Sequence, residues 1–233
     1  MITTIVPLNI QGIDVSLTNS SIFMILTTVL IILFLYFGSQ KELLVPDRLQ
    51  ASVELVYDFI KTLVKENIGP HGTPFIPLIL SIFLFVLFGN LLGMIPYGFT
   101  ITSHIIVTFA LAGFLFVLST GIGFYKHGLK FFRIFFPHGT PWYIAPILVP
   151  IEIISYFSRP ISLSVRLFAN MMAGHTILKV FAGFVVSMGI YGGLLPLALT
   201  SVMTGFELLV SCLQAYVFTI LTCLYLKDAV DLH

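Results

Sequence analysis

The chain has 233 residues, of which 9% are charged and 58% are hydrophobic, and its formal net charge at pH 7 is +1. A typical soluble domain has about 25% charged and about 45–50% apolar residues, so a soluble enzyme, a disordered chain and a fibrous repeat are excluded. A net charge this small gives no field that would recruit nucleic acid. Together with a mean hydropathy of +1.07, the composition predicts an integral membrane protein.

Three uncharged apolar runs in the first half of the chain are long enough to cross a bilayer. A helix of about 20 apolar residues spans the hydrocarbon core. Runs of this kind cover residues 16–37, 75–95 and 101–125. We therefore expect one transmembrane helix in each.

The segment 47–66, between the first two runs, has a different pattern. Its apolar residues recur at spacings of four and three, as on one face of a helix: Leu49, Val53, Val56, Ile60 and Leu63. Its polar residues are expected on the other face: Arg48, Gln50, Glu54, Asp58, Lys61 and Lys65. Asp47, after Pro46, is a suitable helix cap. The segment is too charged to span, so we expect a helix in the membrane interface; docking on another subunit is the alternative.

From Ile144 almost to Leu226 the chain stays apolar, which is too long for two ordinary spans. Turn-forming residues interrupt it near its middle: Gly189, Gly192, Gly193 and Pro196. We predict two unusually long helices, at about 144–188 and 194–227, which must tilt strongly within a bilayer. The fold class is therefore all-α integral membrane, with five transmembrane helices and one amphipathic helix in a single domain, 1–233.

Basic residues predict the orientation of the spans. They follow the first and third spans, whereas the N-terminal tail and the turn at 96–100 contain none. The positive-inside rule places both basic segments on the cytoplasmic or matrix side. The N-terminus is then expected outside and the C-terminus inside. The first residues are neither basic nor Arg-rich, so neither a secretory signal nor a transit peptide is expected.

The first long helix contains polar residues that are costly within a bilayer, at about 2.5–3.5 kcal/mol for each charge. They recur at spacings of three and four and form one stripe along a helix face: Glu152, Ser155, Arg159, Ser162, Arg166 and Asn170. Pro160 interrupts this helix and is expected to bend it. The stripe indicates a functional site, with a hydrogen-bonded seam between helices as the alternative.

Arg166 is the residue of greatest interest, because its guanidinium stays charged at any accessible pH. Glu152 lies 14 residues away, about 21 Å along a helix, and cannot pair with it directly. The required anion is therefore Glu207, by tertiary contact, or a group on a partner. Arg159 and Lys179, nearer the helix ends, suit snorkelling to the interface better.

The last helix has a second polar stripe, formed by Thr200, Thr204, Glu207, Ser211 and Gln214. Next to the stripe of the preceding helix, it could hold water. His175 is the natural proton carrier, although a hydrogen-bonded packing role is an equal alternative. It lies nine residues after Arg166 and so faces the opposite side of a straight helix. The sequence shows no metal-ligand cluster, phosphate-binding loop or nucleophile triad, so we expect no cofactor and no catalysis by the chain itself. Membrane Glu and His residues favour a proton pathway.

Three segments resemble subunit a of F-type ATP synthase, called subunit 6 in mitochondria. They are SRPISLSVRLFANMMAGHTILKVFAGF, GFELLVSCLQAYVFTILTCLYL and FIPLILSIFLFVLFGNLLGMIPYGFTITSHI. The resemblance covers most of residues 45–233, and its RLFANM and LQAYVF cores are highly specific. It implies a membrane stator subunit whose two long helices face a rotating ring of c subunits, each with one membrane carboxyl group.

The resemblance also implies roles for individual residues. Arg166 matches the arginine that attracts the ring carboxylate and keeps two aqueous half-channels apart. Asn170 and Gln214 match polar residues near that arginine, and His175 and Glu207 match a titratable pair in the outer half-channel. The residues that match the inner half-channel are Glu152 and Ser155, with Ser162 on the same stripe.

The implied partners are the c-subunit ring, other stator subunits, the lipid bilayer, and protons with channel water, but no nucleic acid. The Phe- and Ile-rich composition leads us to expect the mitochondrial inner membrane, with a bacterial plasma membrane as the alternative. Three other functions stay open: a secondary transporter that binds an anionic substrate at Arg166, a non-conducting assembly subunit, and coupling to Na⁺ instead of protons.

Overall fold

The computed structural model describes residues 4–6, 9–10, 13–14, 17–40, 46–95, 98, 100–128, 131 and 145–230. Long α-helices dominate these ranges. They are α1 (Asn19–Ser39), α2 (Arg48–Ile68), α3 (Ile76–Gly93), α4 (Ile105–His127), α5 (Ala145–Ser187), α6 (Gly189–Gly192) and α7 (Leu194–Val230). Two 3₁₀ turns precede α3 and α4, η1 (Pro70–Phe75) and η2 (Ile101–Ser103).

Four very short strands precede α1. β1 (Thr4–Val6) pairs antiparallel with β4 (Leu17–Thr18), and β2 (Asn9–Ile10) pairs antiparallel with β3 (Ile13–Asp14). The sequence analysis did not predict these strands, since none is longer than three residues. They do not alter the all-α class of the membrane domain.

Five helices are long and apolar enough to cross a membrane, which confirms the predicted class of a multi-pass all-α protein. The first begins at Asn19, where the Thr18 side chain caps it by accepting a hydrogen bond from the Ser21 amide. The third, α4, begins only at Ile105, because His104 has an extended backbone. It ends at Gly128, whose φ of 56° is left-handed.

The amphipathic segment forms α2, with Asp47 as its cap and Gly69, at φ 81°, ending it. Burial within the chain does not follow the two predicted faces throughout: Leu49, on the apolar face, is 54% exposed, and Gln50, on the polar face, is buried. The reason is that α2 packs on the bundle through its C-terminal half, at Ile60, Leu63, Val64 and Ile68. Gln50 instead lies in a cleft beside the end of α1, where its amide donates to Glu54 Oε1 at 2.7 Å.

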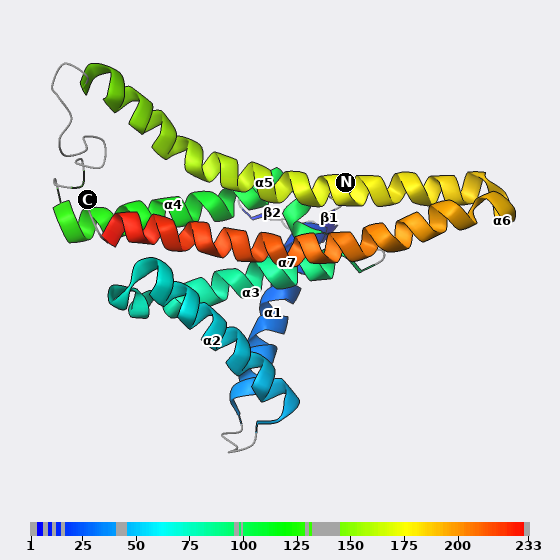
Figure 1. The fold of residues 1–233 in the computed structure, drawn as a ribbon, viewed down its shortest axis with the longest axis horizontal. Coiled ribbons are helices and arrows are strands. Elements are labelled where there is room, and N and C mark those ends of the chain that lie inside the picture. Colours follow the sequence, from blue (N-terminus) through cyan, green and yellow to red (C-terminus); the bar gives the residue numbers. More distant parts are fainter. Residues whose placement is uncertain are drawn as a thin grey trace.

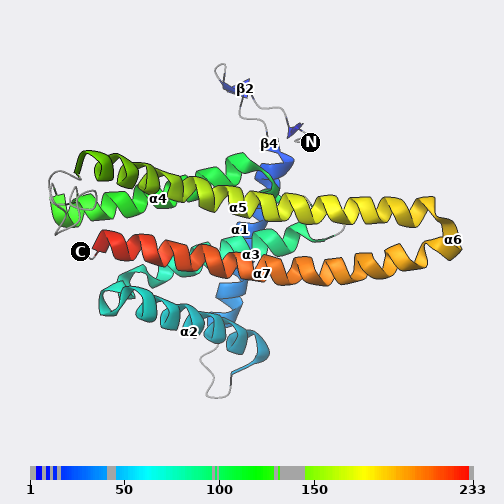
Figure 2. The ribbon, with the colours of Figure 1, turned by 45° about the horizontal axis from the view of Figure 1, so that its top comes forward.

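α5 and α7 form a long antiparallel hairpin joined by α6 (Figures 1 and 2). α3 and α4 pack against one end of this hairpin, and α1 crosses it steeply. The core lies where α2, α3, α4, α5 and α7 meet. Its fully buried side chains include Ile60, Val64, Ile79, Leu84, Val86, Leu115, Leu167, Phe218 and Leu226.

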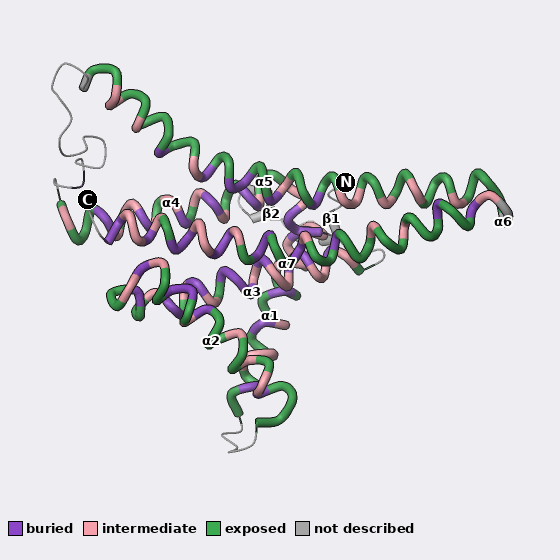
Figure 3. The backbone as a smooth tube through the Cα atoms, in the orientation of Figure 1, coloured by how far each residue is buried: buried purple, intermediate pink, exposed green. Residues whose placement is uncertain are grey.

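The half of the hairpin nearer α6 is mostly exposed on both helices (Figure 3). α5 has 43 residues, a length of about 65 Å against a hydrocarbon core of about 30 Å. It contains Pro150 and Pro160 and bends away from the bundle toward its N-terminal end (Figure 1). Each proline removes one backbone hydrogen bond and crowds the preceding turn, which accounts for the bend.

Candidate functional site

Most members of the polar stripe of α5 are exposed. Ser155, Ser162, Arg166 and Asn170 are exposed, and Glu152 is half-buried. The opposite face of the helix is buried against the bundle through Tyr156, Leu163, Ser164, Leu167 and Met171. A contact between helices of this chain accounts for Arg159, which pairs with Asp228 on α7, but not for the exposed members of the stripe. Its polar groups are available to water or to a partner.

Arg166 has no anion in the described part of the chain, where no carboxylate oxygen lies within 4 Å of its guanidinium. Glu207, the candidate partner from sequence, is buried beside His175 instead. Exposed apolar side chains flank the polar stripe on α5, among them Ile161, Val165 and Met172. A permanent cation thus lies on an exposed, largely apolar helix, with no carboxylate within ion-pair distance in the described part of the chain.

His175 and Glu207 form a pair between α5 and α7. The distance from His175 Nδ1 to Glu207 Oε1 is 3.6 Å, and the Glu207 side chain is 6% exposed. Neither Glu207 oxygen has another hydrogen-bond partner in the described chain. On the other side of the imidazole, Nε2 lies 2.6 Å from Thr100 Oγ1. The predicted orientation of His175, away from Arg166, agrees with this placement.

Gly174 makes the space for the Glu207 carboxylate. A Cβ atom at residue 174 would lie 2.6 Å from Glu207 Oε1 and 2.9 Å from its Cδ. The close approach of α5 to α7 at this level therefore needs glycine. No periodicity in the sequence indicated this requirement, because Gly174 lies within an otherwise ordinary helical run.

The polar stripe of α7 turns inward, unlike that of α5. Glu207, Ser211 and Gln214 are buried, whereas Thr200 is half-buried and Thr204 is exposed. The inward stripe meets a buried polar group on α3 and η2: Asn90 Nδ2 lies 3.4 Å from the Ser211 carbonyl oxygen, and Thr102 Oγ1 donates to Asn90 Oδ1 at 2.8 Å. The two stripes thus have different surroundings, one outward and one within the bundle.

Sequence reasoning missed Asn90, Thr100 and Thr102, which the fold brings to the His175–Glu207 pair. Asn90 had a usable signal, because it is the one amide in the uncharged run 75–95. The two threonines had none, since hydroxyl side chains are common in apolar helices and turns. Their role follows only from the way in which η2 folds back against α3 and α5.

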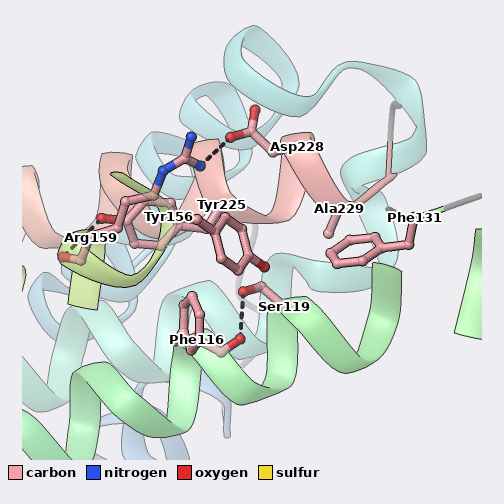
Figure 4. A pocket seen from close by; sticks show the side chains of 8 residues that line it. All are labelled: Phe116, Ser119, Phe131, Tyr156, Arg159, Tyr225, Asp228 and Ala229. Carbon is pink, nitrogen blue, oxygen red and sulfur yellow. Dashed lines mark hydrogen bonds and ion pairs between the residues drawn. The ribbon is translucent and has the colours of Figure 1, made fainter. Parts of the chain in front are cut away.

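Arg159, which we expected to snorkel to the interface, forms an ion pair within the chain. Its Nη1 lies 2.6 Å from Asp228 Oδ2 on α7, and its guanidinium stacks near the rings of Tyr156 and Tyr225 (Figure 4). These groups line a small cavity of about 10 Å³, which is room for about one water molecule. The pair forms because α5 and α7 run side by side, which residue spacing alone did not reveal.

The C-terminal end of α7 is held at the same end of the bundle as the end of α4. Lys126 Nζ donates to the Val230 carbonyl oxygen at 3.1 Å, and His127 Nε2 lies 3.0 Å from the same oxygen. Basic groups suit this position, because the last carbonyls of a helix carry partial negative charge. The basic last turn of α4 and the end of α7 therefore lie on one side.

The fold and the site together define a multi-pass integral membrane protein with ionisable groups held inside its apolar helices. Comparison with known proteins then gives the family. A family model described as ATP synthase A chain matches residues 21–227. The chain belongs to the ATP synthase subunit a family.

Two bacterial relatives match over nearly their full length. The chain is 55% identical to ATP synthase subunit a of Pelagibacter ubique over 226 residues, covering 97% of this chain and 93% of that protein. It is 51% identical to ATP synthase subunit a of Rhodospirillum rubrum over 232 residues, covering 100% of this chain and 96% of that protein. The resemblance drawn from the sequence motifs is confirmed.

Proposed function

We propose that this chain is the proton-conducting stator subunit of an ATP synthase membrane sector and that it forms two offset half-channels against a rotating ring of c subunits. Membership of the subunit a family supports the proton-translocating role. The chain is not catalytic by itself; it couples proton flow to rotation and thereby to ATP synthesis. The other stator subunits, the lipid and channel water complete its surroundings.

The observation that carries this proposal is the outward position of Arg166 without an anion. A charged guanidinium in an apolar setting requires a counter-charge to offset its desolvation. The bundle leaves that position open, and the outward face of α5 is long, apolar and accessible (Figure 3). A ring of helices that each carry one carboxyl group supplies both the missing charge and an apolar surface.

His175 and Glu207 mark the outer half-channel. Buried among Asn90, Thr100 and Ser211, they provide titratable groups that can take up a proton and pass it on through water. The proton then neutralises a ring carboxylate, which can turn into lipid because a neutral carboxyl has a much smaller desolvation penalty. Arg166 stabilises the ionised form of the ring carboxyl group at the stator. Since its guanidinium does not deprotonate, it cannot relay a proton and so blocks a direct proton leak between the two half-channels.

The inner half-channel is assigned to the half of α5 before Arg166. Glu152, Ser155 and Ser162 lie there on the same stripe, toward the end of the bundle that holds the C-terminus of α7. A proton released by the ring carboxyl group leaves along these residues. Asn170, on the outward face, and Gln214, buried on α7, are the polar groups assigned near the arginine.

The arrangement of the helices supports a strong inclination of α5 and α7 to the membrane normal. α1, with 21 residues, has about the length that matches the hydrocarbon core, and it crosses the α5–α7 hairpin steeply (Figure 2). When α1 is placed along the membrane normal, the α5–α7 hairpin is strongly inclined to that normal. The basic residues of α4 and the end of α7 share one side, which favours a C-terminus on the inner side.

The relatives favour a revision of the expected compartment. Both are bacterial, so we assign the chain to a bacterial plasma membrane, the alternative stated from sequence, and no longer to the mitochondrial inner membrane. The composition that suggested a mitochondrion is shared by any chain with many apolar spans. The outer half-channel then opens to the periplasm and the inner one to the cytoplasm.

Disulfide cross-linking tests whether the α5 stripe faces the ring. In a chain whose Cys212 and Cys223 are replaced by Ser, Asn170→Cys is paired with a cysteine next to the ring carboxyl group. We expect a cross-link under mild oxidation. The matched control is Val117→Cys on α4, which is also exposed and should give none. A cross-link from Val117 and none from Asn170 would overturn the assignment of the ring-facing surface.

A further inference from the structure

The hydroxyl group of Thr100 lies between two groups of the candidate proton pathway. Its Oγ1 is 3.0 Å from the carbonyl oxygen of Gly93, at the end of α3, and 2.6 Å from Nε2 of His175 on α5. Thr100 is 5% exposed, and its position just before η2 fixes it against both helices. The contact thus joins a turn to a helix 75 residues further along the chain.

One arrangement of the hydrogens makes both contacts hydrogen bonds. A carbonyl oxygen only accepts, and a threonine hydroxyl has a single hydrogen to donate. In that arrangement the hydroxyl donates to the Gly93 oxygen, and Nε2 of His175 donates to the hydroxyl oxygen. A neutral imidazole carries one N–H, so its other nitrogen, Nδ1, has a free lone pair.

That lone pair faces Glu207, because Nδ1 is the nitrogen 3.6 Å from the Glu207 carboxylate. Among the described residues, Glu207 on α7 is the charged group within ion-pair distance of the ring, and Thr100, which precedes η2 and contacts Nε2, is neutral. On the Nε2 side, the hydrogen bonds run to the hydroxyl and end at a backbone carbonyl, which has no proton to pass on.

We propose that Thr100 is a positioning residue that holds His175 in the Nε2–H tautomer, so that the imidazole exchanges protons with Glu207 through Nδ1 alone. This rests on the proposed function of the pair in proton uptake. His175 is then a one-sided acceptor beside the path, and the path itself runs through Glu207. Without the Thr100 hydroxyl, the ring is free to rotate or to adopt the other tautomer.

The exchange is a balanced proton transfer. The O–H bond of protonated Glu207 breaks as an N–H bond forms at Nδ1, which gives a carboxylate next to an imidazolium. The reverse step returns the proton to the carboxylate, from which water or a ring carboxyl group takes it. Thr100 holds the Nε2–H bond intact throughout, so no proton is lost toward α3.

The test compares ATP-driven proton pumping by reconstituted complexes, with each rate divided by the amount of assembled complex. Thr100→Val keeps the volume of the side chain and removes its hydroxyl, whereas Thr100→Ser keeps the hydroxyl. We expect Thr100→Val to pump at least about tenfold more slowly, as for the loss of a general acid–base partner, with an altered dependence on the pH of the outer side. Thr100→Ser should pump near the unmodified rate. If Thr100→Val does not assemble, Thr100→Ala replaces it.

The combination with His175→Gln separates positioning from packing. If Thr100 acts through His175, Thr100→Val with His175→Gln pumps no more slowly than His175→Gln alone. Independent losses that multiply in the double variant, or a Thr100→Val complex with normal rate and pH profile, would overturn the proposal. Normal pumping by both His175→Gln and Glu207→Gln would instead overturn the proposed function of the pair, on which this inference rests.

Discussion

The ionisable residues inside the long helices differ in what surrounds them. Arg159 is paired with Asp228, and Glu207 is paired with His175. Arg166 has no carboxylate within 4 Å among the described residues. Since an unpaired charge in an apolar setting is costly, the pairs stabilise this chain internally, whereas Arg166 requires a group from outside. A difference in partners, and not in residue type, thus distinguishes Arg166 from Arg159.

The contact between Gly174 and Glu207 gives a prediction at this scale. Gly174→Ala places a methyl group 2.6 Å from the carboxylate oxygen, so Glu207 must move away from His175. We expect proton pumping to fall while the complex still assembles. Gly183→Ala on the same helix is the control, because its Cβ would meet nothing within 4 Å. Equal pumping rates in the two variants would show that the close approach at Gly174 has no functional role.

The Arg159–Asp228 pair predicts a coupled loss of stability. Arg159→Gln and Asp228→Asn each leave one partner beside the Tyr156 and Tyr225 rings without its counter-charge, and the double variant removes both. We expect a coupling free energy of about 0.5–3 kcal/mol, as for residues in direct contact. Thermal unfolding in detergent measures it. The control is Lys227→Gln, which removes a neighbouring charge that has no ion pair in the described chain. Its effect on the free energy of unfolding should be independent of Arg159→Gln and of Asp228→Asn. Additive losses of stability for Arg159→Gln and Asp228→Asn would contradict the ion pair.

At the scale of elements, the two long helices present their polar residues in opposite directions. The stripe of α5 is outward and the stripe of α7 is inward. α3 and η2 cover the α7 stripe with Asn90 and Thr102, whereas the far half of the hairpin has little of the chain packed on it. In the proposed mechanism, a proton is held within the bundle at one level and delivered at the outward surface at another.

The contact between α1 and α2 gives a prediction for this scale. A Cβ at Gly38 would overlap the Val53 side chain and lie 3.5 Å from the Leu49 carbonyl oxygen. Gly38→Ala should separate the two helices and lower stability by about 1–3 kcal/mol, as overpacking does. Gly113→Ala on α4, where a Cβ meets nothing within 4 Å, should be neutral or slightly stabilising. Limited proteolysis between the helices distinguishes the two; equal resistance would argue against a close α1–α2 contact.

At the scale of the whole molecule, the composition and the uncharged runs were enough to predict a five-span helical membrane protein, because length and hydropathy determine which segments can cross a bilayer. The outward stripe of α5 followed from helical spacing alone. The partners of individual residues could not be predicted in the same way. The contacts of Glu207 with Gly174, of Arg159 with Asp228 and of His175 with Thr100 depend on how separate helices pack, and no spacing within one helix records that.

The burial of α2 shows the same limit. Its periodicity identified an amphipathic helix correctly, but the buried face is set by the neighbours that pack on its C-terminal half. Leu49, on the predicted apolar face, is exposed, and Gln50, on the predicted polar face, is buried. In a membrane interface, a leucine that the chain leaves exposed meets lipid and not water. The free-energy cost of exposing an apolar side chain, which in water decides which helix face is buried, is therefore weak there.

The central claim is that Arg166 holds the ionised ring carboxyl group at the stator and separates the two half-channels. Arg166→Gln in the reconstituted complex tests it, by ATP-driven proton pumping and by passive proton leak under an imposed potential. The account predicts a normally assembled complex that has lost pumping and leaks more protons than the unmodified one. Pumping near the unmodified rate, in a complex that assembles and does not leak, would contradict the claim and would mean that another residue keeps the half-channels apart.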